Sequence, residues 1–138
     1  MSKYLMIPLF LVVCSATPSL NFAQEKHTGD SLETVKKNLA DGKAMILDVR
    51  EHSEWDAGHL KLAKLLPLSE FANSDKKKEI AEKTLDKTKI IYTHCKAGGR
   101  CLTAAKHLKA LGYDVRALKP GYEDLLKAGF EKAEEKPK

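Results

Sequence analysis

Hydrophobic residues beyond position 30 concentrate in short runs separated by longer stretches in which they recur with a helical period. The runs are 44–49 (AMILDV), 63–68 (AKLLPL), 89–94 (KIIYTH) and 113–118 (YDVRAL). Each is as long as a typical strand, and 89–94 is rich in β-branched and aromatic residues. The apolar run at 44–49 is consistent with a strand that is buried on both faces, as in a parallel sheet.

The stretches between the runs predict helices. In 30–42 (DSLETVKKNLADG) the residues Leu32, Val35 and Leu39 share one face. Asp30 is expected to cap this helix, Glu33 to complete a capping box, and Gly42 to end it. The segment 50–60 is expected to be a polar loop or a short helical turn, and 69–85 to be helical in pieces. Further helices are expected at 99–111, with Gly112 as its C-cap, and at 122–128 after a turn at Pro120-Gly121.

Short buried strands that alternate with helices predict an α/β fold, in which a central parallel β-sheet is flanked by helices on both faces. In such sheets ligands bind beyond the carboxyl ends of the strands. No internal repeat or low-complexity linker divides the chain. We therefore expect one domain over 24–138, with its core at about 30–130 and a charged, frayed tail after it.

The first 23 residues have the layout of a secretory signal peptide. Lys3 precedes the apolar run Leu5–Val13, and small and polar residues follow as far as Ala23, where we expect cleavage. The apolar run is about half the ~20 residues needed to span a bilayer, so a retained membrane anchor is disfavoured. A lipoprotein anchor at Cys14 is the other alternative. The mature protein is thus expected to be exported, periplasmic or secreted, without stable membrane insertion.

Composition narrows the classes of partner. The 138 residues are 43% hydrophobic and 31% charged, with a formal net charge of +5 that comes from scattered lysines. A nucleic-acid-binding protein would show a one-sided basic stripe with aromatic residues for stacking, and neither is present. Nucleic-acid binding is therefore not expected, whereas attraction of a small anion needs only a local positive site.

The chemistry of the chain concentrates in His94–Cys101 (HCKAGGRC), where a predicted strand gives way to a predicted helix. A thiol reacts as the thiolate, whose pKa falls at helix N-termini and beside cations. Gly98 and Gly99 allow a loop whose N–H groups converge on its centre, and Lys96 and Arg100 add positive charge. Cys95 is therefore a nucleophile in an anion nest, half of a disulfide, or a small residue in an ordinary turn.

The spacing between Cys95 and Arg100 separates two kinds of thiol chemistry. Cysteine phosphatases place one more residue between the cysteine and the arginine, and the corresponding position here is Cys101. The shorter loop makes a tighter cradle, which suits a terminal sulfur on the cysteine better than a phosphoryl group.

These residues resemble the active-site loop of the rhodanese-like sulfurtransferases. The match comprises CKAGGR at 95–100 and LDVREHSEWDAGHL at 47–60, in the order and spacing of that family. The chain is therefore identified as a single-domain, exported member. The resemblance implies the rhodanese-like three-layer fold, with Cys95 as the sulfur acceptor and Lys96, Ala97, Gly98, Gly99 and Arg100 lining the persulfide pocket. The sequence departs from the family at 61–63, Pro120 and Leu125.

Other residues near the motifs are expected to pack around the site or to support it. Cys101 lies on the apolar arc of the 99–111 helix, so it either packs in the core or serves as a redox partner of Cys95, for which an oxidising compartment gives opportunity. Asp48 is expected to form an ion pair that braces the site floor, and Arg50 is a candidate for the pocket mouth. Trp55 and His59 are expected to shape the wall.

Two histidines, His59 and His94, are not expected to bind a metal or to act as a catalytic base. His59 lacks neighbours at metal-ligand spacing, so no metal is expected there. His94 precedes Cys95 on a strand, so the two side chains should face opposite sides, and a Cys–His dyad is disfavoured.

The resulting prediction is a thiosulfate sulfurtransferase. Cys95 takes the outer sulfur of thiosulfate, sulfite leaves, and cyanide or a thiol removes the sulfur from the persulfide, with no cofactor. Lys96 and Arg100 are expected to attract the dianion and so to lower KM more than they raise kcat. The main alternative is a sulfur carrier or sensor that docks to a protein acceptor, followed by an arsenate reductase or a phosphatase.

Overall fold

The structure is a computed structural model that describes residues 24–134. The predicted signal peptide at 1–23, the alternative lipid site Cys14 and the end of the charged tail lie outside the described residues. The helices are α1 (Leu32–Ala40), α2 (His52–Ala57), α3 (Leu68–Phe71), α4 (Lys77–Thr84), α5 (Gly99–Ala110) and α6 (Tyr122–Lys127). The strands are β1 (Ala44–Asp48), β2 (Ala63–Leu65), β3 (Ile90–His94) and β4 (Val115–Ala117).

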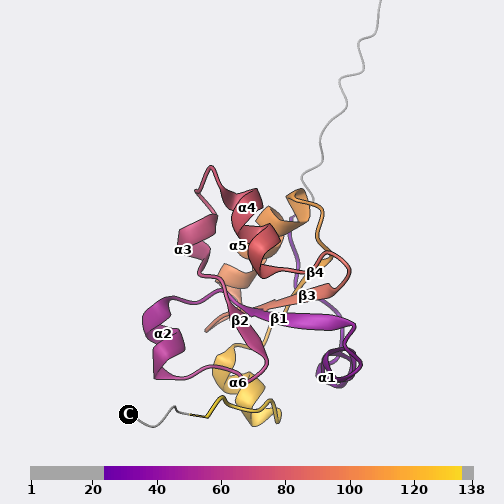
Figure 1. The fold of residues 1–138 in the computed structure, drawn as a ribbon. Coiled ribbons are helices and arrows are strands. Elements are labelled where there is room, and N and C mark those ends of the chain that lie inside the picture. The colour runs from indigo at the N-terminus through magenta and orange to yellow at the C-terminus, as the bar shows by residue number, and fades with distance from the viewer. Residues whose placement is uncertain (1–23, 135–138) are drawn as a thin grey trace, which may run out of the picture.

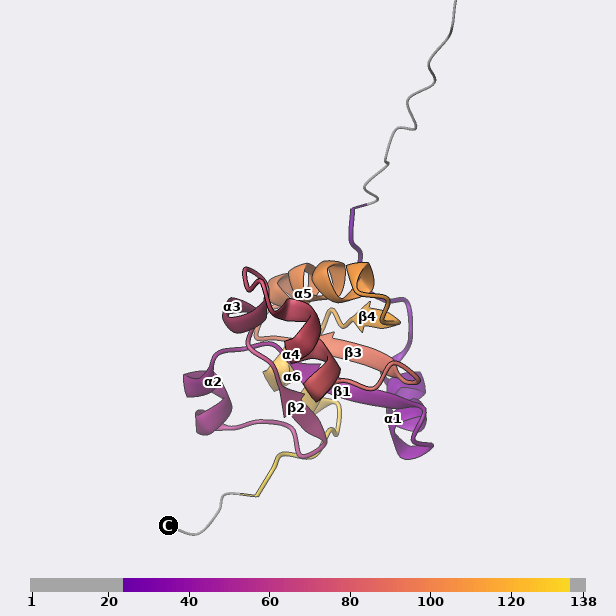
Figure 2. The ribbon, with the colours of Figure 1, turned by 45° about the horizontal axis from the view of Figure 1, so that its top comes forward.

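The four strands form one parallel sheet in the order β2-β1-β3-β4 (Figure 1). Helices α3, α4 and α5 cover one face of this sheet, and α1 and α6 cover the other (Figures 1 and 2). The predicted α/β fold, with a central parallel sheet flanked by helices, is confirmed. Among residues 24–134 no helix is long and apolar enough to cross a membrane.

Two hydrophobic clusters fill the space on either side of the sheet. Successive residues of a strand point to opposite faces, so Leu47 and Ile91 pack toward α5 while Ile46 and Tyr92 pack toward α1 and α6. All four side chains are essentially inaccessible to solvent. Burial on both faces agrees with the apolar sequence of the central strand β1.

The first helix begins one residue later than expected. Ser31, not Asp30, is the N-cap of α1, and its hydroxyl accepts a hydrogen bond from the Thr34 amide. Asp30 instead accepts from the Tyr92 hydroxyl and from Arg116, at 2.7 and 2.8 Å. The capping prediction was therefore wrong at this helix, because a long-range partner holds the Asp30 carboxylate.

Both ends of the described chain are tied to the domain. Thr28 donates its amide to the Ala117 carbonyl at 2.8 Å, so the N-terminal segment runs along the edge strand β4. At the other end, Ala133 donates to the His59 carbonyl and Lys61 donates to the Glu131 carbonyl, both at 2.9 Å. The expectation of a tail frayed from residue 131 is therefore wrong for its first residues.

The strand order brings predicted site residues together at the carboxyl ends of β1 and β3. From β1 the chain continues to β2 on one side, whereas β3 lies on the other side of β1, so the connections diverge between β1 and β3. A crevice forms outside the carboxyl ends of strands at such a point. The final residues of the two strands, Asp48 and His94, are register partners, and Cys95 follows at once.

Candidate active site

The loop between β3 and α5 wraps around the sulfur of Cys95. The Gly98 amide donates to Cys95 Sγ at 3.0 Å, and the amides of Ala97 and Cys101 are directed at the same atom. These N–H groups precede or belong to the first turn of α5, where no backbone carbonyl within the helix is available to them. The sulfur thus sits in a ring of backbone donors, which is the arrangement that favours an anion.

This environment lowers the pKa of the Cys95 thiol from its ordinary value to about 5. The largest cause is a hydrogen bond from the Cys101 thiol, and the amides of Cys101, Ala97 and Gly98 add to it, while burial opposes it. The sulfur is therefore ionised at neutral pH. The sequence predicted the ionisation from the helix terminus and the nearby cations, whereas the structure assigns the leading part to a second thiol.

Cys101 lies in the first turn of α5, completely buried, and its thiol is free, as is that of Cys95. Its Sγ also lies 3.0 Å from the Gly98 carbonyl and 3.3 Å from the Leu118 carbonyl. The interaction with the Cys95 sulfur and burial raise its pKa, so the thiol stays protonated. It thus remains a hydrogen-bond donor beside the Cys95 sulfur.

The loop needs glycine at Gly98, and an unexpected residue braces it there. Gly98 has φ of 90°, and a Cβ at this position would lie 2.9 Å from the Lys119 carbonyl oxygen and 3.1 Å from His27 Nε2. His27 forms a hydrogen bond with the Gly98 carbonyl at 2.7 Å. His27, in the N-terminal segment, therefore contacts Gly98, the residue whose amide donates to Cys95 Sγ.

The turn before α6 closes the other side of the loop. Tyr122 donates its amide to the Cys95 carbonyl at 2.9 Å. Gly121 approaches so closely that a Cβ would lie 1.8 Å from the Lys96 carbonyl oxygen. Pro120 and Leu125, which depart from the family pattern, leave this contact intact, because it depends on Gly121 and on a backbone amide.

Arg100 points to a carboxylate rather than to an open pocket. Its guanidinium forms two hydrogen bonds with Glu54 of α2, at 2.6 and 2.9 Å. This pairing lowers the pKa of the Glu54 carboxyl to about 2, with the Arg100 hydrogen bonds as the main cause. The ion pair ties α2 to the start of α5 and offsets the charge that was expected to attract an anion.

Asp48 and Arg50 form a buried ion pair below the loop. Arg50 Nε and Nη2 donate to the Asp48 carboxylate at 2.8 to 3.0 Å, and the two side chains are 0% and 5% exposed. Arg50 also donates to the Gly58 carbonyl at 2.8 Å and stacks over the Tyr122 ring, 4.2 Å from its centroid. The expected ion pair is thus present, and it links the end of β1 to the turn that closes the loop.

A cavity of about 230 Å³ opens beside the loop, with Arg50, Glu54, Lys96 and Tyr122 in its wall. Lys96 is exposed and forms no ion pair within residues 24–134. Cys95 itself is 1% exposed and does not line this cavity. Of the two predicted cations, Lys96 is therefore the one that faces space a small anion could occupy.

The remaining residues considered in the sequence are Trp55, His59 and His94. Trp55 and His59 stack with 3.6 Å between ring centroids, and His59 Nδ1 lies 3.0 Å from the Trp55 carbonyl oxygen. His94 is fully buried, and neither ring nitrogen has a hydrogen-bond partner. Its Nε2 lies 3.7 Å from Asp48, and burial lowers its pKa, so the ring is neutral at neutral pH.

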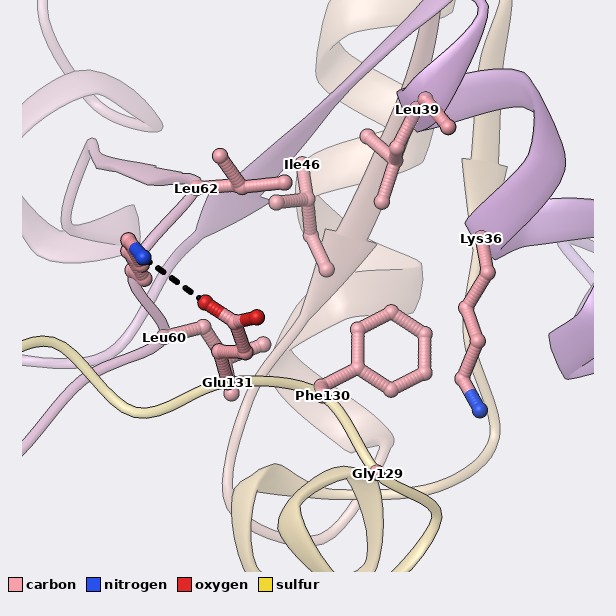
Figure 3. Close-up of a pocket in the computed structure, with 10 residues that line it drawn as sticks. Lys36, Leu39, Ile46, Leu60, Leu62, Gly129, Phe130 and Glu131 are labelled. Carbon is pink, nitrogen blue, oxygen red and sulfur yellow. Dashed lines mark hydrogen bonds and ion pairs between the residues drawn. The ribbon is translucent and has the colours of Figure 1, made fainter.

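A larger cavity lies away from Cys95, and none of the predicted site residues lines it. It measures about 260 Å³ and is bounded by apolar side chains such as Leu39, Ile46, Leu60 and Phe130, beside the Lys61–Glu131 ion pair (Figure 3). No group of three or more His, Cys, Asp or Glu residues that could hold a metal occurs within 24–134.

The sequence analysis missed three contributors to the site, namely His27, Glu54 and Gly121. Gly121 follows a proline in a predicted turn, and Glu54 lies within the motif at 47–60, so each of these two positions carried a signal. His27 and Glu54 act across 71 and 46 residues of chain, and no local pattern shows that they would reach the loop at Cys95.

Comparisons with known proteins agree with this geometry. A family model described as the rhodanese-like domain matches residues 31–128. The human single-domain sulfurtransferase TSTD1 is 25% identical with a TM-score of 0.60, over 71% of this chain and 94% of that one. A Helicobacter pylori protein of known structure is 32% identical with a TM-score of 0.55, over 66% and 78% of the two chains.

Two curated relatives carry another activity in their names. Proteins called tRNA uridine(34) hydroxylase from Escherichia fergusonii and Hamiltonella defensa are 30% and 32% identical over 91 and 94 residues. Each match covers 64% or 63% of this chain and 25% of the relative, so the chain spans about a quarter of their length. With the motif, the sheet order and the matched domain in agreement, the chain belongs to the rhodanese-like domain family, a family of sulfurtransferase-type chemistry.

Proposed function

We propose that this protein is a thiosulfate sulfurtransferase that carries sulfur on Cys95. The thiolate attacks the outer sulfur of thiosulfate, the bond between the two sulfurs of the donor breaks, and sulfite leaves with the bonding electron pair. A persulfide remains on Cys95. Cyanide or a thiol then attacks the outer sulfur of this persulfide, which forms thiocyanate or a new persulfide and returns the Cys95 thiolate.

The observation that carries this proposal is the ring of amides around Cys95 Sγ, which together with the Cys101 thiol lowers the pKa of Cys95 to about 5. The donors are backbone groups and need no reorganisation when the negative charge moves from the first sulfur to the second. Two successive displacements at one sulfur predict ping-pong kinetics. The chemistry as proposed uses no metal and no organic cofactor.

Lys96 supports a small dianionic donor. It is exposed at the wall of the 230 Å³ cavity beside the loop, whereas Arg100 is neutralised by Glu54. In this proposal Lys96 attracts thiosulfate, and Arg100 and Glu54 hold the loop. Asp48, Arg50 and His59 support the site from below, and they do not touch the reacting atoms.

The test is mass spectrometry of the purified protein before and after thiosulfate. We expect the Cys95 peptide to gain one sulfur atom, cyanide to remove it, and the Cys95→Ser variant to gain none. Turnover with thiosulfate and cyanide then divides an enzyme from a sulfur carrier that delivers to one protein acceptor. A loaded persulfide without turnover would establish the carrier, and phosphate release from an aryl phosphate or arsenate reduction without loading would overturn sulfur transfer.

We also propose that the protein is exported after cleavage near Ala23. The support is the apolar run Leu5–Val13 behind Lys3. Cell fractionation with N-terminal sequencing tests this directly: a new N-terminus near Gln24 outside the cytoplasm is expected. A lipid-modified Cys14, or an intact Met1 in the cytoplasm, would contradict it.

We propose no nucleic-acid substrate, because the chain matches only a quarter of the length of the relatives named tRNA uridine(34) hydroxylase.

A further inference from the structure

A second nucleophile lies directly against the reactive sulfur and has no part in the transfer proposed above. Residue 101 reaches Cys95 Sγ twice, through its backbone amide and through its thiol. The loop holds both sulfurs at Gly98, whose amide lies 3.0 Å from Cys95 Sγ and whose carbonyl lies 3.0 Å from Cys101 Sγ. Both thiols are free, and they are the two cysteines within residues 24–134.

Packing alone does not explain a cysteine at this position. Alanines at 104 and 105 fill the same buried face of α5 without any polar atom. Cys101 instead places a polarisable, protonated thiol against the one atom that receives sulfur in the proposed reaction. Its complete burial shields it from external oxidants and thiols, so its natural reaction partner is Cys95.

Building on the proposed function, we propose that Cys101 is a resolving cysteine that releases the bound sulfur as sulfide. The Cys101 sulfur attacks the inner sulfur of the Cys95 persulfide. A Cys95–Cys101 disulfide forms, the bond between the inner and outer sulfurs breaks, and the outer sulfur leaves with the bonding pair. The ionised outer sulfur takes the Cys101 proton as the bond breaks, so hydrosulfide leaves, and a proton from water converts it to hydrogen sulfide.

This step is balanced without an external oxidant. The outer sulfur of the persulfide is reduced by two electrons to sulfide, and the two cysteine thiols are oxidised together to the disulfide. For a second turnover an external dithiol must reduce the disulfide. The whole cycle then converts thiosulfate and a dithiol into sulfite, sulfide and the oxidised dithiol.

The geometry suits this reaction better than attack by an external thiol. The two sulfurs each lie 3.0 Å from an atom of the same residue, Gly98, so a local movement of the β3–α5 loop is enough to bring them within the bonding distance of a disulfide, which is about 2 Å. The attacking group comes from the buried side, since Cys101 is 0% exposed. Because displacement at sulfur runs in line, the outer sulfur leaves on the side away from Cys101.

The test is an acceptor-free chase of loaded protein. Wild-type protein is loaded with thiosulfate without oxygen, freed of excess reagent by gel filtration, and left in buffer without cyanide or thiol. We expect one equivalent of sulfide for each persulfide loaded. Peptide mapping should then show Cys95 and Cys101 in one linked peptide that has lost the added sulfur and two hydrogens.

Cys101→Ser is the matched control, because its hydroxyl keeps a hydrogen-bond donor near Cys95. Its sulfide release is expressed per persulfide loaded, so a slower first step does not affect the comparison. We expect its persulfide to persist at least tenfold longer than that of the wild type. The wild-type rate should not change on dilution, since the reaction is intramolecular.

A wild-type persulfide as long-lived as that of Cys101→Ser, or a release rate proportional to protein concentration, would overturn the inference. The wild-type peptide map decides the question even where the variant fails to fold. If thiosulfate loads no sulfur, the proposed function fails at that separate step. Protein loaded with polysulfide then tests Cys101 alone, and a stable persulfide there would refute its role.

Discussion

At the scale of single residues, the reactivity of Cys95 depends on neutral groups more than on formal charges. Arg100 forms an ion pair with Glu54, which offsets its charge. The largest cause of the low pKa of Cys95 is the Cys101 thiol. Hydrogen bonds to an ionised group are short-range and directional, so donors that touch the sulfur outweigh a cation that faces another carboxylate.

The first prediction concerns the ionisation of Cys95. Thiolate absorbance in the ultraviolet should rise with a midpoint near pH 5, and the rate of persulfide formation should rise through the same range and level off by neutral pH, because the ionised form reacts. Cys95→Ser should lack this titration. Cys101→Ala should move the midpoint upward, since the largest contribution is removed. A wild-type midpoint near the ordinary 9.0 would contradict this account.

At the scale of elements, two segments distant in sequence clasp the β3–α5 loop. The N-terminal segment holds it at Gly98 through His27, and the turn before α6 holds it at Lys96 and at the Cys95 carbonyl. A loop that must place several amides around one atom gains from such support, because misplacement of even a fraction of an ångström weakens each hydrogen bond.

His27 is therefore expected to act as a positioning residue. His27→Ala should slow persulfide formation severalfold and raise the pKa of Cys95, because the Gly98 peptide loses its brace. His27→Gln, whose amide can donate to the same carbonyl, should restore much of both. Lys26→Ala, an exposed neighbour, is the control. An unchanged thiolate titration in His27→Ala would show that the contact only adds stability.

Gly121→Ala should be among the most damaging small substitutions. A Cβ would lie 1.8 Å from the Lys96 carbonyl oxygen, so backbone must move in either the turn or the loop. We expect a loss of about 2 kcal/mol or more of unfolding free energy, measured by denaturant titration, together with slower sulfur transfer. Gly29→Ala, which meets nothing within 4 Å, should be close to neutral. Equal effects of the two would refute the close approach.

At the scale of the whole molecule, the parallel sheet brings Asp48, Arg50 and His94 together beneath the loop. A buried ion pair beside a neutral, unpartnered imidazole makes the fold sensitive to acid. Burial lowers the pKa of His94 below its ordinary 6.5, so the unfolded chain binds a proton on this ring more readily than the folded one. Stability from this group is thus complete above about pH 6.5 and is lost as the pH falls.

The unfolding free energy of the protein should therefore decline between about pH 7 and about pH 5, by up to about 1.4 kcal/mol per pH unit from this group. Cys95 contributes in the same direction, because its pKa is also lower in the folded chain. The comparison is best made in a Cys95→Ser background, where His94→Leu should flatten the decline. An equal slope with and without His94 would exclude the imidazole as its source.

Particular residues show which features of the structure the sequence predicts and which it does not. The β-branched and aromatic residues at 89–94 predicted β3, and Gly112 marked the end of α5, because strand propensity and helix termination leave local patterns. Asp30 shows the opposite case: its local pattern indicates a cap, but Tyr92 and Arg116 compete for the carboxylate. Nothing beside His27 or Glu54 in the chain indicates that either would reach the loop.

The sequence by itself thus determined the α/β class, the rhodanese-like family and the position of Cys95 at a strand end, since each depends on residues close together in the chain. Only the tertiary structure decided which groups surround that loop. The strand order, with β1 beside β3, sets Asp48 opposite His94, and the packing of distant segments brings in His27, Glu54 and Gly121. Such contacts depend on the arrangement of whole elements in space, which no short stretch of sequence records.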